Sequence, residues 1–211
     1  MKTIQNFLGA AGMSAVLCLF TVTLHAQDAA ANYWPFKVGN TWTIDTKVED
    51  KTLIQILTVT KVTQQGASSD ATVEYKLNDK VIQTEVYRFD DKGISRVSSD
   101  AAILNPPFPV VQYPMAADKK WSWKGTLNAN GKEFHGDSQI STSGPEVLKL
   151  PAGEFKAIRV HSELTLSLDS GEKIVVPNDY WFAPGVGLVK QSARLGKLDI
   201  LGQLSSYKLN E

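Results

Sequence analysis

Turn signals recur along this chain at short intervals, and β-strands fit between them. Asn78-Asp79 and Asn130-Gly131 are dipeptides that favour two-residue β-hairpins. Further turns are indicated at Pro151–Gly153, Asp169–Gly171 and Pro184-Gly185, where proline and glycine suit the turn geometry. No segment of the mature chain carries the apolar stripe of an amphipathic helix. The spacing predicts about eleven or twelve antiparallel strands, joined mainly by hairpins between neighbours.

The clearest strand pattern lies at Phe155–Leu168. Ile158, Val160 and Leu164 alternate there with polar residues, which predicts a strand with one buried face. Leu53–Leu57 differs, because apolar residues fall on both of its faces. We expect this second strand to be covered on both sides, by the core and by either another element or a ligand.

Ala101–Pro114 is the one long stretch without a strand pattern. Pro106, Pro107 and Pro109 lack a backbone N–H, so the stretch is not expected to pair as a central strand. It is also rather apolar for a loop and includes Phe108. Either it packs over an open end of the sheet or it docks a partner.

The first residues have the features of an export signal. Lys2 supplies a positive start, an apolar run follows, and a small residue, Ala26, precedes the expected cleavage site. The alternative is a retained N-terminal anchor. We expect a signal peptide at 1–26, a short tether at 27–32 and a single β domain at 33–211, in the periplasm or outside the cell. Cys18, the only cysteine, lies within the signal, so no disulfide is expected in the mature chain.

The charge is balanced, with 22 basic and 22 acidic residues. No basic excess exists to hold the chain on nucleic acid or on anionic lipid. Nucleic acid is therefore not an expected partner. The apolar run of the first residues is too short for a stable membrane span, which needs about 20 apolar residues, so the chain is not expected to be an integral membrane protein.

One spacing occurs twice. A proline that follows an aromatic residue precedes a tryptophan by seven positions, in Pro35–Trp42 and again in Pro114–Trp121. Each tryptophan is expected to begin a strand. Beyond this spacing the two halves align poorly, so we interpret the pair as one strand-entry device used twice, and duplication stays open.

Few residues point to catalysis. His135 shares a strand face with Asp137, and His161 shares one with Glu163, so neighbouring strands could bring together metal ligands. Histidines on polar strand faces are more often solvated. We therefore expect no enzyme activity, no metal and no cofactor. A hydrolase or metal enzyme is a third hypothesis, and it requires His135 and His161 to lie close together.

The aromatic residues form the most distinctive inventory. They predict either a core with aromatic anchors at strand entries or a cavity for an apolar ligand. For a ligand, the expected contacts are Trp121, Trp123, Phe108, Leu53, Ile54, Ile56 and Leu57.

Three segments occur in the order Tyr33–Trp42, Leu150–Ala157 and Tyr180–Lys190. The set resembles a broad group of bacterial exported proteins of unknown function, which look related to the superfamily of the lipoprotein carrier and receptor of the outer-membrane lipoprotein pathway. The resemblance implies a strongly curved antiparallel sheet, an open half-barrel whose concave side can hold an acyl chain. It carries over no catalytic residue.

The fold class expected is all-β, a single curved sheet or open half-barrel. The leading hypothesis is an exported, non-catalytic protein that binds an apolar small molecule or lipid in the cell envelope. The alternative is a structural or adhesion module that binds an envelope protein through its surface, which predicts an exposed apolar patch around Phe108.

Overall fold

The computed structural model describes residues 33–168 and 171–210, and this part of the chain is built from strands and turns alone. None of its segments is a helix that could cross a membrane. The predicted signal and tether at 1–32 lie outside the described residues, as do Asp169 and Ser170 of one predicted turn. The strands are β1 (Thr41–Val48), β2 (Lys51–Gln65), β3 (Ser68–Leu77), β4 (Lys80–Asp90), β5 (Gly93–Ser99), β6 (Ala102–Gln112), β7 (Lys120–Ala129), β8 (Lys132–Leu150), β9 (Gly153–Ser167), β10 (Lys173–Ala183), β11 (Gly187–Leu195) and β12 (Leu198–Lys208).

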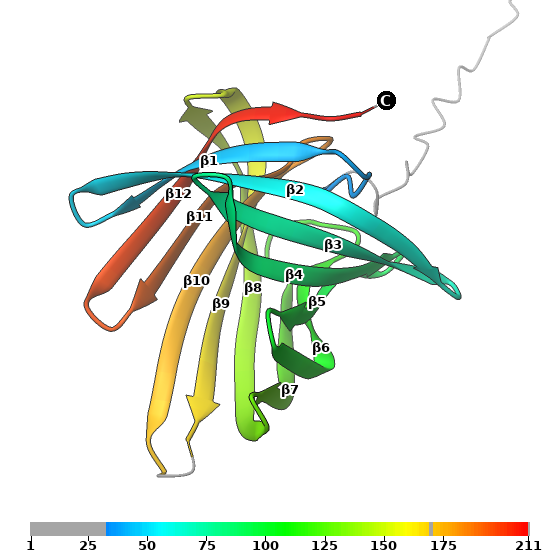
Figure 1. Ribbon diagram of the computed structural model, residues 1–211, viewed down its shortest axis with the longest axis vertical. Helices are drawn as coiled ribbons and strands as arrows, with labels where there is room; N and C mark the ends of the chain where they lie inside the picture. The colour runs from blue at the N-terminus through cyan, green and yellow to red at the C-terminus, as the bar shows by residue number, and fades with distance from the viewer. Residues whose placement is uncertain (1–32, 169–170, 211) are drawn as a thin grey trace, which may run out of the picture.

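Each strand pairs with its neighbour in the chain, and β1 also pairs with β12 (Figure 1). The predicted all-β class and the neighbour hairpins are confirmed. The sheet is a closed barrel, however, and differs in this from the open half-barrel that was expected. The physical reason is the pairing of Thr41–Val48 with β12, which satisfies the backbone of both strands and leaves neither as a free edge.

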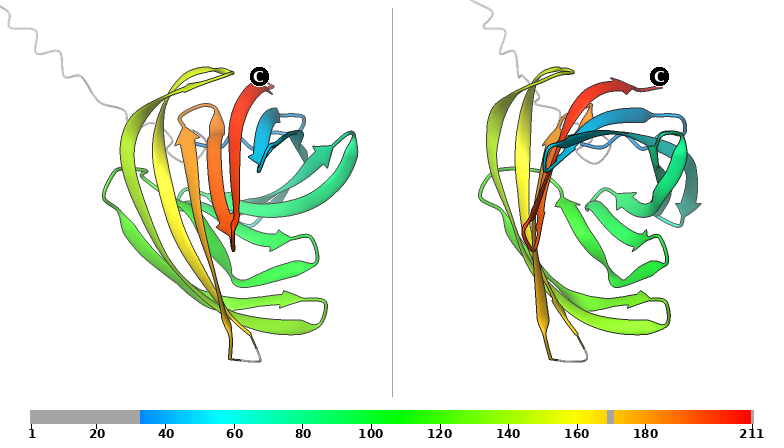
Figure 2. Two further views of the ribbon diagram at one scale, coloured as in Figure 1. Left: turned by 90° about the vertical axis from the view of Figure 1, so that its left-hand side faces the viewer. Right: turned by 60° about the vertical axis from the view of Figure 1, so that its left-hand side comes forward.

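The hairpins follow the turn chemistry that the sequence indicates. Asn78 and Asp79 have φ values of 50° and 60°, and Asn130 and Gly131 have values of 53° and 75°. Both pairs therefore adopt the left-handed conformation that a two-residue hairpin with a type I′ turn requires. The turns that lead from odd to even strands lie at one end of the barrel. The opposite end, where β1 begins, is here called the entry end (Figure 2).

An aromatic cluster fills the barrel at its entry end. Trp34, ahead of β1, is 3% exposed and lies 4.8 Å from the ring of Tyr87 and 5.6 Å from that of Phe182. Trp42 is fully buried, and its Nε1 donates a hydrogen bond to the Val186 carbonyl at 2.7 Å. These rings bury a large apolar area. The first of the two tryptophans predicted to begin strands thus anchors β1 in the core.

The proline-containing stretch is a strand, so the prediction that it is irregular is wrong. β6 pairs with β5 at both of its ends, but with β7 at only three positions, from Ile103 to Asn105. Trp121 Nε1 donates to the Pro109 carbonyl at 3.1 Å, and Trp123 Nε1 donates to the Pro106 carbonyl at 2.9 Å. We call this line of contact the β6–β7 seam. Prolines are tolerated in β6 because indole N–H groups supply hydrogen bonds where the ladder to β7 is missing.

The alternation predicted for β9 is confirmed, with Ile158 and Val160 buried and Glu163 exposed. The prediction that another element covers the second face of Leu53–Leu57 is wrong, and the alternative, cover by a ligand, stays a prediction. Ile54 is 59% exposed on the outer face, whereas Leu57 is buried. The outer surface of the barrel at β2 faces solvent, so apolar residues on both faces did not indicate two covered faces.

Candidate functional site

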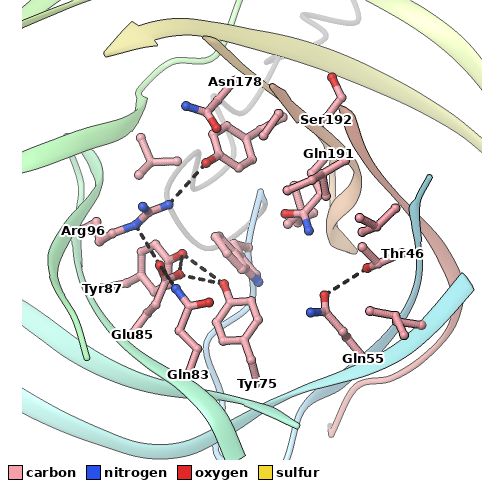
Figure 3. A pocket seen from close by; sticks show the side chains of 18 residues that line it. Thr46, Gln55, Tyr75, Gln83, Glu85, Tyr87, Arg96, Asn178, Gln191 and Ser192 are labelled. Carbon is pink, nitrogen blue, oxygen red and sulfur yellow. Dashed lines mark hydrogen bonds and ion pairs between the residues drawn. The ribbon is translucent and has the colours of Figure 1, made fainter. Parts of the chain in front are cut away.

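A cavity of about 290 Å³ lies inside the barrel, beside the aromatic cluster of the entry end (Figure 3). This volume is near the lower limit of the range typical for small-molecule sites, about 300 Å³. The cavity has apolar and polar lining side chains, contributed by strands from both ends of the sequence. The apolar lining includes Trp34, Val48, Leu53, Val110, Leu188 and Ile200, and the polar lining includes Thr46, Gln55, Tyr75, Gln83, Glu85, Tyr87, Arg96, Asn178, Tyr180 and Gln191.

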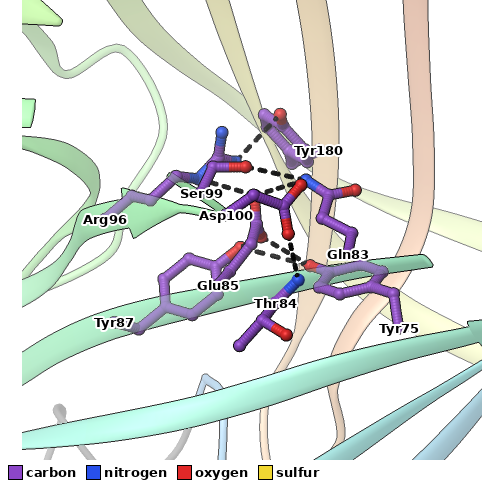
Figure 4. Close-up of polar contacts among 9 residues, drawn as sticks. All are labelled: Tyr75, Gln83, Thr84, Glu85, Tyr87, Arg96, Ser99, Asp100 and Tyr180. Carbon is purple, nitrogen blue, oxygen red and sulfur yellow. Dashed lines mark hydrogen bonds and ion pairs between the residues drawn. The ribbon is translucent and has the colours of Figure 1, made fainter. Parts of the chain in front are cut away.

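Glu85 on β4 is the centre of the polar network, and it is only 3% exposed. Its Oε2 accepts hydrogen bonds from the Tyr75 hydroxyl at 2.7 Å and from the Tyr87 hydroxyl. Its Oε1 accepts one from Gln83 Nε2 at 3.1 Å and lies 3.3 Å from Arg96 Nε (Figure 4). A buried carboxylate needs such partners because its desolvation is costly. Both oxygens of Glu85 are therefore engaged by the protein itself.

The phenols beside Glu85 stay protonated over a wide pH range. Burial raises the pKa of Tyr75, and the negative charge of Glu85 raises it further. The same two causes raise the pKa of Tyr87. Both hydroxyls can therefore act as permanent hydrogen-bond donors to the carboxylate.

Arg96 on β5 stands opposite, with its side chain 24% exposed. Burial is the largest single influence and lowers the pKa of Arg96. The Glu85 carboxylate, together with the nearby tyrosines Tyr87, Tyr180 and Tyr75, outweighs burial and keeps this pKa above its ordinary value. The guanidinium lies 5.8 Å from the centroid of the Tyr87 ring and 3.4 Å, through Nη2, from the Tyr180 hydroxyl. Its buried Nε makes no hydrogen bond, although it forms an ion pair with Glu85. Arg96 is thus charged, paired and still rich in unused donors.

Side-chain amides complete the polar lining. Gln83 donates through Nε2 to Glu85 and to Ser99, which leaves its carbonyl oxygen available. Gln55 accepts a hydrogen bond from Thr46 at 3.0 Å, which leaves its amino group available. The cavity therefore offers both donors and acceptors to a bound molecule.

The seven residues predicted to contact a ligand do not form one site, although the rings of Phe108 and Trp123 lie 5.4 Å apart. Leu53 lines the cavity, and Leu57, Phe108 and Trp123 are buried in the core. Trp121 packs against the core and bonds β6, whereas Ile54 and Ile56 lie on the outer surface. Whether any of the seven binds a ligand stays a prediction.

Sequence reasoning missed Glu85 and Arg96. The available signal was alternation, because Glu85 shares a strand face with Tyr87, and Arg96 shares one with Ile94. A charged residue at an inward position on each of two strands indicates a buried pair. The pairing could not be assigned without the register, which sets Tyr87 opposite Arg96.

The two histidines lie apart on the outer surface. In the β8–β9 register His135 faces Ser167, and His161 faces Ser141, six positions further along β8. At about 3.3 Å per residue, this separates them by about 20 Å. Within the described ranges no group of three or more potential metal ligands is found. The condition set for a histidine-based hydrolase or metal site is not met.

No protein-family model matches this chain, and no curated protein matches its sequence. Solved structures share its fold. A candidate exported protein with a YmcC-like fold from Bacteroides fragilis is 16% identical, with a TM-score of 0.58 over 84% of this chain and 99% of that one. A candidate lipoprotein from Parabacteroides distasonis is 15% identical, with a TM-score of 0.56 over 86% of this chain and 100% of that one. The likeness concerns the fold, and the resemblance to the lipoprotein carrier and receptor stays a prediction.

Proposed function

We propose that this protein is an exported, non-catalytic binding protein that holds one small amphipathic molecule inside its barrel. The observation that carries the proposal is the cavity, which sets apolar side chains beside a hydrogen-bonded polar network. Export is supported by the signal features of residues 1–26 and by the fold shared with candidate exported proteins and lipoproteins.

The two kinds of lining residue have different roles in binding. Covering the apolar side of a ligand beside Leu53, Leu188 and Ile200 gains about 25 cal/mol per Å² before ordering costs. The polar side chains gain less net energy, because they exchange water for a ligand group, but they orient the ligand. An amphipathic molecule uses both.

The alternative of a surface module loses its main support. It predicted an exposed apolar patch around Phe108, yet Phe108 is only 8% exposed and lies 5.4 Å from the Trp123 ring. The cavity therefore supports ligand binding better than it supports adhesion.

The test is native mass spectrometry of the protein purified from its own host, followed by organic extraction of whatever is bound. We expect an adduct that extraction removes. A clean apo mass, together with no response to added eight-carbon amphiphiles, contradicts the proposal.

Two neighbouring residues on β2 provide a matched pair of variants. Leu53→Trp fills the cavity and should abolish the adduct, whereas Ile54→Trp adds the same bulk to the outer face and should leave it unchanged. Equal adducts in the two variants would place the ligand outside the cavity.

A further inference from the structure

The charges that line the cavity cancel. Glu85 and Arg96 are the only carboxylate and the only basic side chain among its described lining residues, and they lie 3.3 Å apart. Their formal charges sum to zero. A ligand that carries a net charge would therefore give up part of its hydration in the cavity without gaining a free counter-charge, which costs free energy.

The atoms of the network that are already hydrogen-bonded also disfavour a charged ligand. Both oxygens of Glu85 already accept hydrogen bonds, and Oε1 also faces Arg96, so an incoming cation would have to compete with Arg96 for the charge of Glu85. Arg96 can still donate from its guanidinium, but its positive charge already faces Glu85. It suits a neutral oxygen acceptor, such as a carbonyl or hydroxyl, because a second anion would meet the Glu85 carboxylate just behind it.

The amides select the kind of head group. Gln83 keeps a free acceptor, Gln55 keeps free donors, and the side chain of Gln191 makes no hydrogen bond with the residues that the structure describes. A carboxylate can only accept hydrogen bonds and an ammonium can only donate them. A hydroxyl or a primary amide does both, and so can satisfy this mixed lining.

We propose that the ligand is an uncharged amphiphile whose head group is a hydroxyl or an amide, with its alkyl part packed near Leu53 and Leu188. This inference rests on the proposed function, since it names the ligand class of the same cavity. It makes the Glu85–Arg96 pair a device for charge selection.

The direct test compares four eight-carbon probes on the wild-type protein by calorimetry at pH 7.5: octan-1-ol, octanamide, octanoate and octylammonium. We expect octan-1-ol and octanamide to bind at least about tenfold more tightly than either ion. Octanoate or octylammonium binding as tightly as octanamide overturns the charge selection and leaves the proposed function standing. Binding of none of the four overturns the inference about the ligand class, and the proposed function falls with it only if the protein from its own host also has a clean apo mass.

Glu85→Gln provides the sharper test. It keeps an acceptor at this position but leaves the charge of Arg96 uncompensated, so octanoate should gain about tenfold relative to octanamide. An unchanged ranking in a folded variant overturns the inference, and if the variant does not fold, the wild-type series decides alone. The matched control is Asp179→Asn, which removes an arginine-paired carboxylate from the outer surface and should leave the probe ranking as it is.

Discussion

Two carboxylate–arginine pairs, one inside the barrel and one outside, use their arginines differently. Outside, Asp179 Oδ1 accepts from Arg159 Nε and from His161 Nδ1, at 2.7 and 2.8 Å, and Arg159 Nη2 also lies 2.7 Å away. Inside, Glu85 takes its hydrogen bonds mainly from phenols and an amide, and Arg96 is paired without a hydrogen bond from its Nε. Arg159 therefore donates hydrogen bonds to its carboxylate, whereas Arg96 Nε donates none to Glu85.

This difference separates two purposes. The outer cluster ties β9 to β10, and Arg159 also lies over the Trp181 ring at 5.5 Å, which is an ordinary structural arrangement. In the inner pair the two charges balance and Glu85 is hydrogen-bonded, but Arg96 keeps a donor, Nε, without a hydrogen-bond acceptor. That combination is expensive in a core and useful in a binding site.

The largest expected effect is that of Glu85→Ala. Removing the carboxylate leaves Arg96 as an unpaired charge and the hydroxyls of Tyr75 and Tyr87 without their acceptor. We expect the free energy of unfolding to fall by about 3–5 kcal/mol, measured by urea denaturation with circular dichroism. A loss below about 1 kcal/mol would mean that the inner pair contributes no more stability than a surface pair, which would contradict the difference between the inner and outer pairs.

Tyr75→Phe removes one donor and no charge. The hydrogen bond to a buried carboxylate is worth about 1.5–3 kcal/mol, and we expect a loss of that size in the same denaturation experiment. Tyr180→Phe is the matched control, because its hydroxyl lies 3.4 Å from Arg96 and contributes a weaker contact. Equal losses in the two variants would contradict the central place of Glu85.

Asp179→Asn tests the outer pair. Asp179 and Arg159 lie at the surface, where solvent screens the interaction, so the expected loss of unfolding free energy is about 1 kcal/mol or less. Added salt should reduce the difference between wild type and variant, and it should leave the effect of Glu85→Ala nearly unchanged. The reverse salt dependence would refute the assignment of inside and outside.

The smallest effect concerns acid. Burial favours the neutral form of Asp179, but hydrogen bonds from Arg159 and His161 outweigh it and hold the pKa of Asp179 below its ordinary value of 3.8. The folded-state pKa is thus below the unfolded one, so Asp179 stabilises the fold above about pH 4 and loses this contribution as the pH falls through the folded-state value. The difference in unfolding free energy between wild type and Asp179→Asn should shrink between pH 6 and pH 2. A constant difference would contradict the lowered pKa.

The sequence predicts local structure well in this protein and long-range pairing poorly. Asn130-Gly131 and the alternation at Ile158 and Val160 act within a few residues, and both predictions are confirmed. Closure of β1 on β12, and the register that sets Tyr87 opposite Arg96, depend on pairings between distant or shifted positions that no short pattern encodes. The prolines of β6 led to the wrong prediction for a related reason. The hydrogen-bond donors to the carbonyls of Pro106 and Pro109 are indole N–H groups of another strand, β7, which the local sequence does not reveal.

The β6–β7 seam is the strand pairing of the barrel with the fewest paired positions. Parting β1 from β12 means separating eight paired positions, whereas parting β6 from β7 means separating three and two indole hydrogen bonds. The seam also divides the strands into six before it and six after it, and each half begins with a tryptophan that follows a proline by seven positions. We therefore expect the barrel to open first between β6 and β7, where the indole hydrogen bonds of Trp121 and Trp123 replace most of the backbone pairing.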